Sequence, residues 1–351
     1  MREIIETPEA AFRHYAKARA GGESLHAVTG SLINRTWSVG AGPDFALQLV
    51  AAQFGDEVNA RIELLGRRLA NARVRVPQLL RTDDGELSLP GPEGRRWRLL
   101  TWIPGRIRHA ISTPADAASA AALVARFHDA LFKSPEGQEL PVSDFHDTDR
   151  RFADLARALE RASGHPHEAE VRSLAEELER RLQVWRGRHP PPPLPPRPGH
   201  GDLKISNIVF EPHAGNARAL IDLDTLGRYP LDAELGDALR SWCNIAGEDH
   251  ARPRFDRETF AAAIEGYFTT SRTVTRAERA QLVHGLGRIT LELVARFLTD
   301  VIEDRYFAWD PAVAPSRAEH NLLRARGQLE LARHIASLRA DLEAIIRRHR
   351  R

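Results

Sequence analysis

The first hundred residues combine short apolar runs with one amphipathic segment of helical period. Four runs have the length and the β-branched or aromatic content of strands: Leu25–Val28, Thr36–Val39, Phe45–Val50 and Trp97–Trp102. Apolar residues from Val58 to Leu69 recur at intervals of four, three and four, which is one face of a helix. Asp56 is the expected N-cap. The pattern predicts a small antiparallel sheet packed against a single helix.

The period changes to that of helices from Thr113-Pro114 onward. Leu123, Phe127 and Leu131 share one helical face, and longer helical stretches run from about Thr275 to Glu303 and from about Ser316 to Arg351. We therefore expect an α+β protein of two lobes, divided where an apolar run meets Pro104-Gly105. Residues 1–102 would form the small lobe and residues 103–351 a larger, mainly helical lobe.

A short hairpin interrupts this helical part. Asn207–Phe210 and Arg218–Ile221 are apolar strands, and the residues between them, 211–216, are turn formers. Antiparallel pairing of the two strands brings Asn207 and Asp222 side by side. The loop before Asn207 carries Asp202 to the same end of the hairpin.

These side chains match the needs of phosphoryl transfer from a magnesium nucleotide. The reaction requires a positioned hydroxyl, an acceptor for its proton and a metal that neutralises the phosphates. Mg²⁺ prefers carboxylate and amide oxygens, so we assign Asn207 and Asp222 to the metal. Asp202 is then the candidate base, and Lys204 is the cation that would neutralise either the migrating phosphoryl group or the anionic form of the acceptor. The alternative is that Asp202 and Asn207 only tie a tight turn, which is a common use of both residues.

Composition narrows the class of protein without naming an activity. The chain has 351 residues, 42% of them hydrophobic, which leaves room for two cores. With 50 Lys and Arg against 48 Asp and Glu, its formal charge of +2 does not favour a nucleic-acid partner. The single cysteine, Cys243, excludes an intramolecular disulfide and is expected to be a buried thiol. No apolar run reaches the length of a membrane span or a signal-peptide core, so a cytoplasmic location is the default expectation.

Three stretches together resemble a known superfamily. His200–Asn207, Ala217–Thr225 and Glu234–Arg240 resemble the aminoglycoside phosphotransferase and choline kinase superfamily, which shares the two-lobed architecture of protein kinases, and within it the N-acetylhexosamine 1-kinases. The resemblance implies ATP and Mg²⁺ as cofactors and a sugar, phosphorylated on its anomeric hydroxyl, as the small-molecule substrate. An aminoglycoside, choline or amino-alcohol kinase, and an inactive nucleotide-binding module, stay open as alternatives. The oligomeric state is also open.

The resemblance also suggests where the nucleotide binds. Gly30 and Ser31 lie in a loop that would cover the phosphates, and the backbone at Thr101 and Ile103 would pair with the adenine edge. The resemblance places Gln48 where the wider superfamily has a strand lysine that pairs with the phosphates. A glutamine at this strand position is, however, also a feature in which the chain resembles the hexosamine 1-kinases. Asn207, Asp202 and Asp222 are all present, which favours an active enzyme.

The expected substrate site draws on side chains that can bind hydroxyl groups. Asp224 falls on the same side of its strand as Asp222 and is expected to bind a sugar hydroxyl, or the metal through water. Asn34 in the covering loop, Arg296 and Tyr306 complete the predicted substrate residues, and Asn321 is a further candidate. In that loop, Leu32 replaces the histidine that the hexosamine kinases usually carry.

Overall fold

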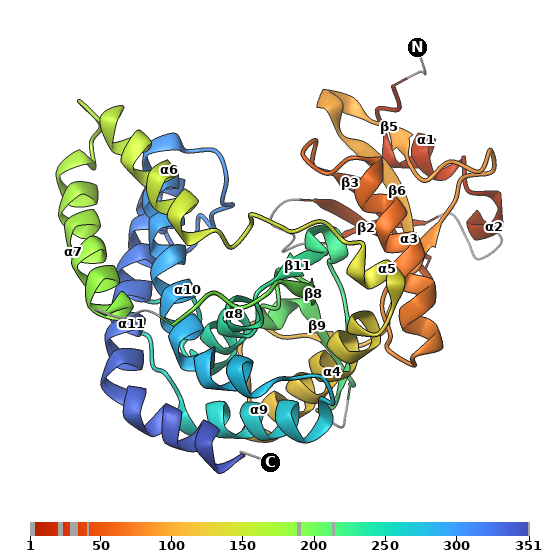
Figure 1. Ribbon diagram of the computed structural model, residues 1–351. Helices are drawn as coiled ribbons and strands as arrows, with labels where there is room; N and C mark the ends of the chain where they lie inside the picture. The colour runs from red at the N-terminus through yellow and green to blue at the C-terminus, as the bar shows by residue number, and fades with distance from the viewer. Residues whose placement is uncertain are drawn as a thin grey trace.

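The computed structural model describes residues 4–19, 24–28, 34–40, 42–187, 191–212 and 215–349, and it has two lobes (Figure 1). The small lobe is built on an antiparallel sheet in the order β1-β2-β3-β6-β4, with β5 also paired to β6. Its strands are β1 Leu25–Val28, β2 Arg35–Val39, β3 Phe45–Val50, β4 Leu79–Leu80, β5 Leu89–Pro90 and β6 Arg96–Thr101. The four predicted strands are confirmed, and the two-residue strands β4 and β5 are additional.

The amphipathic helix of the small lobe is α3, Asp56–Asn71. Its N-cap is Gly55, which offers no side-chain cap, whereas Asp56 lies in the first turn and pairs with Arg96 at 2.7 Å. The prediction of Asp56 as the cap is therefore wrong by one residue. The prediction of a single helix is also incomplete, since the short helices α1 (Pro8–Phe12) and α2 (Ala16–Arg19) precede the sheet.

The small sheet separates two apolar cores. Leu47, Leu49 and Leu99 pack with Phe12 and Trp97 in a core of the small lobe alone. The apolar face of α3 instead joins the large core that continues through the helical lobe. Because α3 lies between the sheet and the helical lobe, its apolar contacts fix the position of the small lobe on the large one.

The large lobe is mainly helical, as expected from the change in period. Thr113 caps its first helix through a capping box with Asp116. Its helices are α4 Pro114–Phe132, α5 Pro135–Gln138, α6 Thr148–Glu160, α7 Glu168–Arg186, α8 Leu231–Cys243, α9 Arg257–Thr270, α10 Arg276–Glu303 and α11 Arg317–Arg348. None of the described helices has both the length and the apolar character needed to cross a membrane. Cys243 is buried, as predicted.

The predicted hairpin is present. β9 (Ile208–Phe210) pairs antiparallel with β10 (Ala217–Leu220), and β7 (Arg106–Ile107) adds a third strand beside β9. A second small ribbon joins β8 (Arg197–Gly199) to β11 (Gly227–Tyr229). The chain thus leaves the small sheet at Thr101 and has joined the hairpin of the large lobe by Arg106, while the division at residue 102 stays a prediction.

Candidate active site

The loop before β9 brings three of the predicted residues into direct contact. The Lys204 Nζ lies 2.8 Å from Asp202 Oδ2, and the Asn207 side chain donates to the same carboxylate at 3.0 Å and to the Asp202 carbonyl at 2.9 Å. Burial alone would raise the pKa of Asp202, but the charge and hydrogen bond of Lys204 outweigh it and lower that pKa. The carboxylate is therefore ionised near neutral pH and has the form that a proton acceptor needs.

A buried carboxylate from α8 holds the backbone of this loop. Glu234 accepts from the N–H groups of His200 at 2.6 Å and Gly201 at 2.9 Å, and it contacts His128 Nε2 at 3.2 Å. Burial would raise the pKa of Glu234, but the hydrogen bond from His128 outweighs it and lowers that pKa. The loop ahead of Asp202 is thus fixed by a charged acceptor in the interior.

A second buried pair supports the loop from α10. The ring of His146 contacts the Gly201 carbonyl at 3.0 Å through Nε2 and Glu292 at 3.3 Å through Nδ1. Burial would lower the pKa of His146, but the Glu292 carboxylate outweighs it and raises that pKa. Glu292 also accepts from Thr148 at 2.7 Å, so α6 and α10 are joined behind the loop.

Asp222 follows β10 at the same end of the hairpin. Its backbone is left-handed, with φ 63° and ψ 62°, and the preceding N–H of Ile221 donates to the Asn207 carbonyl at 3.0 Å. Asp222 is exposed to solvent at its surface. Desolvation by the protein atoms near its carboxylate, together with the Asp224 and Asp202 carboxylates, raises the pKa of Asp222 to about 7. The structure therefore brings Asp202, Asn207 and Asp222 together.

The oxygen atoms of Asn207 and Asp222, at this end of the hairpin, are suitable ligands for the metal ion of a magnesium nucleotide. The amide nitrogen of Asn207 is engaged by Asp202, while its amide oxygen and the Asp222 carboxylate accept no hydrogen bond from the residues that the structure describes. Carboxylate and amide oxygens are the ligands that Mg²⁺ prefers, and in nucleotide enzymes phosphates and water complete the coordination. Within the described ranges, no group of three or more His, Cys, Asp or Glu side chains is arranged to hold a metal. A magnesium ion whose coordination is completed by phosphates and water does not need such a group.

Asp224, by contrast, has an ion-pair partner at one carboxylate oxygen and a hydrogen-bond donor at the other. Its Oδ1 lies 2.6 Å from the Arg98 guanidinium, and its Oδ2 accepts from Asn34 at 2.7 Å. Asn34 also accepts from the Ala51 N–H at 3.0 Å. The predicted substrate residues Asn34 and Asp224 therefore contact each other across the two lobes, and both are buried.

Both the oxygen and the nitrogen of the Gln48 side-chain amide form hydrogen bonds. Its oxygen accepts two hydrogen bonds from Arg98, at 2.7 and 2.9 Å, and its nitrogen donates to Thr36 at 3.2 Å. Sequence reasoning did not single out Arg98. The available signal was a charged residue in the middle of an apolar strand, between Trp97 and Leu99.

The connection after β6 contains the expected adenine-binding backbone. The Thr101 N–H donates to Gln78 and the Trp102 N–H donates to Asp44, at 2.9 and 2.7 Å. The Ile103 N–H has no backbone partner among the described residues, which leaves it available to a ligand. Gly30 and Ser31, together with Leu32, lie outside the described residues.

The predicted acceptor side is rich in arginine and aromatic rings. Arg296 on α10 stacks on Phe145 at 4.6 Å and donates to the Tyr306 hydroxyl at 3.3 Å. Arg151 on α6 lies over the same Phe145 ring at 5.9 Å. Arg296 is near enough to Asp202 for its charge to add to the lowering of the pKa of Asp202, after the larger effect of Lys204.

Asn321 lies in the protein interior and is not exposed to a substrate. It is fully buried and donates to Asp300 at 2.9 Å. Asp300 in turn accepts from the N–H groups of Tyr306 and Phe307, at 2.7 and 2.8 Å. Asn321 thus fixes the loop that presents Tyr306.

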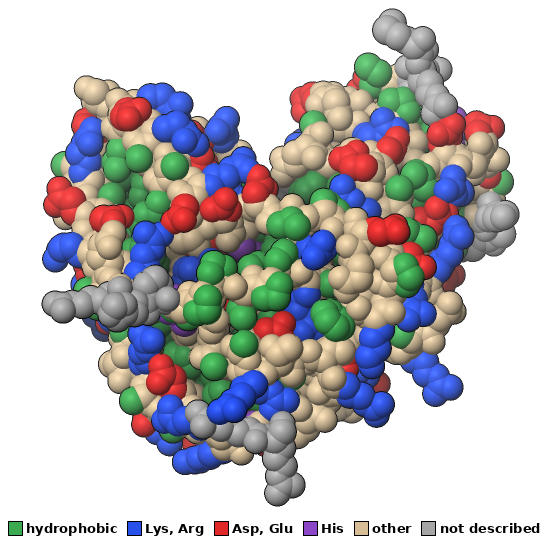
Figure 2. All heavy atoms as spheres, viewed as in Figure 1, with side chains coloured by type: hydrophobic (Ala, Val, Ile, Leu, Met, Phe, Trp, Pro, Cys, Tyr) green, Lys and Arg blue, Asp and Glu red, His purple; other side chains and the backbone are tan. Residues whose placement is uncertain are grey.

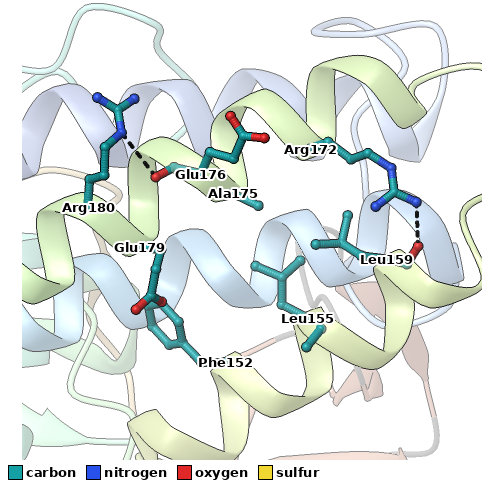
Figure 3. Close-up of a pocket in the computed structure, with 9 residues that line it drawn as sticks. Phe152, Leu155, Leu159, Arg172, Ala175, Glu176, Glu179 and Arg180 are labelled. Atoms are coloured by element: carbon teal, nitrogen blue, oxygen red, sulfur yellow. Dashed lines mark hydrogen bonds between the residues drawn. The ribbon is translucent and has the colours of Figure 1, made fainter.

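The surface of the molecule is hollowed between the small lobe and the arm formed by α6 and α7 (Figure 2). A separate pocket of about 580 Å³ lies between α6 and α7 of that arm (Figure 3). It is lined by Phe152, Leu155, Ala156, Leu159, Arg172, Ala175, Glu176, Glu179 and Arg180. None of the predicted site residues lines it, so this pocket is not part of the candidate active site.

Solved structures show where this fold occurs. An aminoglycoside phosphotransferase from Alicyclobacillus acidocaldarius matches with a TM-score of 0.60 and 17% identity, over 98% of each chain. The GDP complex of aminoglycoside 2'-phosphotransferase-IIIa matches with a TM-score of 0.59 and 17% identity, over 87% of this chain and 92% of that one. A choline/ethanolamine kinase family protein from Mesorhizobium loti matches with a TM-score of 0.54 and 18% identity, over 93% and 97%. The expected kinase-like α+β fold is confirmed.

The two-lobed fold and the loop-and-hairpin site define a small-molecule phosphotransferase. The model of the phosphotransferase enzyme family matches residues 24–280, and the chain belongs to that family.

Proposed function

We propose that this protein transfers the γ-phosphoryl group of ATP to the anomeric hydroxyl of a neutral sugar, an N-acetylhexosamine or a close relative, giving the sugar 1-phosphate and ADP. The observation that carries the proposal is the contact of Asp202 with Lys204 and Asn207 at the end of the hairpin that bears Asp222. This arrangement provides a proton acceptor, a cation and two oxygen ligands at one place, which are the components that phosphoryl transfer needs.

Asp202 acts as the proton acceptor in this proposal. Its lowered pKa keeps the carboxylate ionised, and an anomeric hydroxyl, which is more acidic than an ordinary alcohol, needs a base only late in the transfer. Lys204 is held on the same carboxylate at 2.8 Å. As the sugar oxygen bonds to phosphorus and its proton moves to Asp202, Lys204 offers positive charge to the migrating group.

Asn207 and Asp222 hold the metal ion with the nucleotide phosphates. Magnesium, when bound, neutralises charge on those phosphates. The chain's part is to keep the two oxygens in place, through the Asn207 bond to Asp202 and through the left-handed turn at Asp222. The free N–H of Ile103 is the expected partner of the adenine edge.

The charges on the acceptor side support a neutral acceptor. Arg296 and Arg151 share the Phe145 ring beside the loop of Asp202, and burial together with the charge of Arg296 lowers the pKa of Arg151. A cationic aminoglycoside or amino alcohol would meet these two guanidinium groups, whereas sugar hydroxyls can accept hydrogen bonds from them. Tyr306, partly exposed beside Arg296, offers a further hydroxyl and a ring face.

The second candidate is phosphorylation of an aminoglycoside or an amino alcohol. It is supported by the aminoglycoside phosphotransferase and choline/ethanolamine kinase family structures with the same fold. At 17% and 18% identity these structures share the fold, and they leave the acceptor to be decided by measurement.

The test is coupled ADP release with Mg-ATP over a panel of free sugars, their methyl glycosides and cationic acceptors. We expect turnover with a free N-acetylhexosamine and none with its methyl glycoside, because the glycoside blocks the reacting oxygen. Asp202→Asn should lower kcat by about 10²- to 10⁴-fold, the usual contribution of a general base. The matched control is Asp149→Asn, an exposed carboxylate on α6, which should leave turnover unchanged. Faster turnover with cationic acceptors would favour the second candidate, and nucleotide binding without any turnover would contradict both.

A further inference from the structure

Among the residues of the small lobe that the structure describes, one guanidinium is almost completely enclosed. Arg98 on β6 is 1% exposed and lies directly opposite Gln48 of β3 in the sheet register. Burying a lone guanidinium is strongly unfavourable unless charged and polar partners surround it. The partners of Arg98 therefore indicate what keeps this charge inside the protein.

Those partners come from three elements and both lobes. Arg98 donates twice to Gln48 Oε1 and, at 3.2 Å, to Asn59 on α3. Its ion pair is with Asp224 of the large lobe, at 2.6 Å, and both side chains are at most 3% exposed. Gln48 and Asn59 are neutral acceptors, so among the described residues that contact Arg98 directly, Asp224 is the one that carries an opposite charge. The arginine thus joins β3 and α3 of the small lobe to the segment that directly follows the metal candidate Asp222.

This arrangement matters because of the charges around it. The Asp224 and Asp202 carboxylates both act to raise the pKa of Asp222, and a nucleotide would add further negative charge. The charges of Lys204, from the large lobe, and of Arg98 oppose this rise. Gln48, opposite Arg98 in the sheet, carries no charge and accepts from its guanidinium.

We propose that Arg98 is a positioning residue for metal-nucleotide binding: through its buried pair with Asp224 it holds the turn that presents Asp222 and seats the small lobe on the hairpin. The proposal rests on the proposed function only in that the nucleotide binds with a metal at Asp222. In this view Asn34 has a related task, since it holds the second oxygen of Asp224 from the loop before β2. Asp224 then serves as the bridge between the lobes.

The experiment measures the dissociation constant of ATP by calorimetry, with Mg²⁺ and separately with EDTA, in the absence of any acceptor. Arg98→Met removes the charge and keeps much of the volume. We expect it to weaken Mg-ATP binding by about tenfold or more, as expected for loss of a close charge interaction, with a much smaller effect on ATP in EDTA. A general loosening of the fold would reduce both affinities alike, so the difference between them reports on the metal site.

Two further variants test the route through Asp224. Asp224→Asn should lower the Mg-ATP affinity in the same way, and Arg98→Met combined with Asp224→Asn should lose about as much as either alone, because the pair acts as a unit. Arg98→Lys keeps the positive charge but loses the planar guanidinium whose N–H groups reach three partners. Its affinity for Mg-ATP should therefore fall between those of the wild type and Arg98→Met. The matched control is Arg96→Met, two residues earlier on the same strand and paired with Asp56 near the surface, which should bind as the wild type does.

The outcomes separate this proposal from the proposed function. A wild-type chain that does not bind Mg-ATP overturns both. If the wild type binds and Arg98→Met binds equally well, or if the losses of the two single variants add in the double variant, only the role of Arg98 is overturned. If Arg98→Met does not fold, Asp224→Asn and the double variant decide the question, with folding checked by melting temperature.

Discussion

Asp222 lies in the left-handed region of backbone conformation, which is uncommon for a residue with a side chain and clusters at functional sites. Aspartate tolerates it better than most residues because its short side chain can form local hydrogen bonds. The turn follows the end of β10, and the Asp222 carboxylate is near enough to that of Asp202 for the two charges to interact. The sequence gives no signal of this conformation, and the prediction that Asp222 approaches Asn207 came from strand pairing alone.

The raised pKa of Asp222 leads to a prediction of pH dependence. Desolvation by nearby protein atoms and the neighbouring Asp224 and Asp202 carboxylates raise that pKa to about 7, so below this value the carboxyl is protonated and cannot bind the metal. Since protons and metal compete for the same oxygens, lowering the pH from 8 to 6 should weaken the Mg²⁺ affinity of the ATP complex by about tenfold. Calorimetric titration of Mg²⁺ at each pH measures this. Asp222→Asn, which cannot titrate, supplies the slope due to the nucleotide itself, and an equal slope in the wild type would contradict the prediction.

The residues predicted correctly to meet are those whose proximity follows from local geometry. Asp202, Lys204 and Asn207 lie within six positions, and Asp222 is brought to them by one hairpin. Asn34 and Asp224 are 190 positions apart, and their contact depends on how the two lobes are seated. No periodicity in a sequence encodes such a distance, so their engagement with each other could not be foreseen.

At the scale of elements, the first turn of α8 supports the loop ahead of Asp202. Glu234 accepts two backbone N–H groups and contacts His128 while fully enclosed. A carboxylate offers two acceptor oxygens, whereas glutamine offers one oxygen and an NH₂ group that cannot accept from an N–H. A change at this helix position therefore acts on the loop through its backbone.

We predict that Glu234→Gln destabilises the protein by about 1–3 kcal/mol, the cost of leaving a buried donor without an acceptor. The displaced loop should also lower kcat on the order of tenfold, in keeping with the effect of small misplacements at reacting groups. Denaturant unfolding and coupled ADP release measure the two effects. Glu179→Gln, an exposed acid on α7, is the matched control. Unchanged unfolding free energy in Glu234→Gln would show that the loop does not depend on this carboxylate.

The elements predicted well are those long enough to carry a period. The strands at residues 25–28 and 45–50 and the long helices α10 and α11 agree with the sequence pattern to within a few residues. β7, β8 and β11 have two or three residues each and depend on partners distant in the chain, so no alternation marks them. The cap of α3 was missed because Gly55 caps without a side chain, whereas Asp56 fits the usual pattern one position later.

At the scale of the whole molecule, the candidate site includes residues of both lobes. The small lobe contributes Asn34 and Arg98, the connection after β6 contributes the backbone near Ile103, and the large lobe contributes the loop and the hairpin. The two lobes are joined at Asp224 and along α3, whose apolar face belongs to the large core. A ligand that binds between them should therefore stabilise the molecule as a unit.

This leads to the last prediction, for thermal unfolding with nucleotide. At a concentration about 100 times its dissociation constant, Mg-ATP should add about 2.7 kcal/mol to the free energy of unfolding, by mass action. We expect one cooperative transition that moves upward by several degrees, measured by scanning calorimetry, with ATP in EDTA as the control and a smaller shift there because Asn207 and Asp222 then have no metal to hold. Asn207→Ala should reduce the difference between the two conditions. If only one of two separate transitions moved, the lobes would unfold independently, and binding would not couple them through Asp224 and α3.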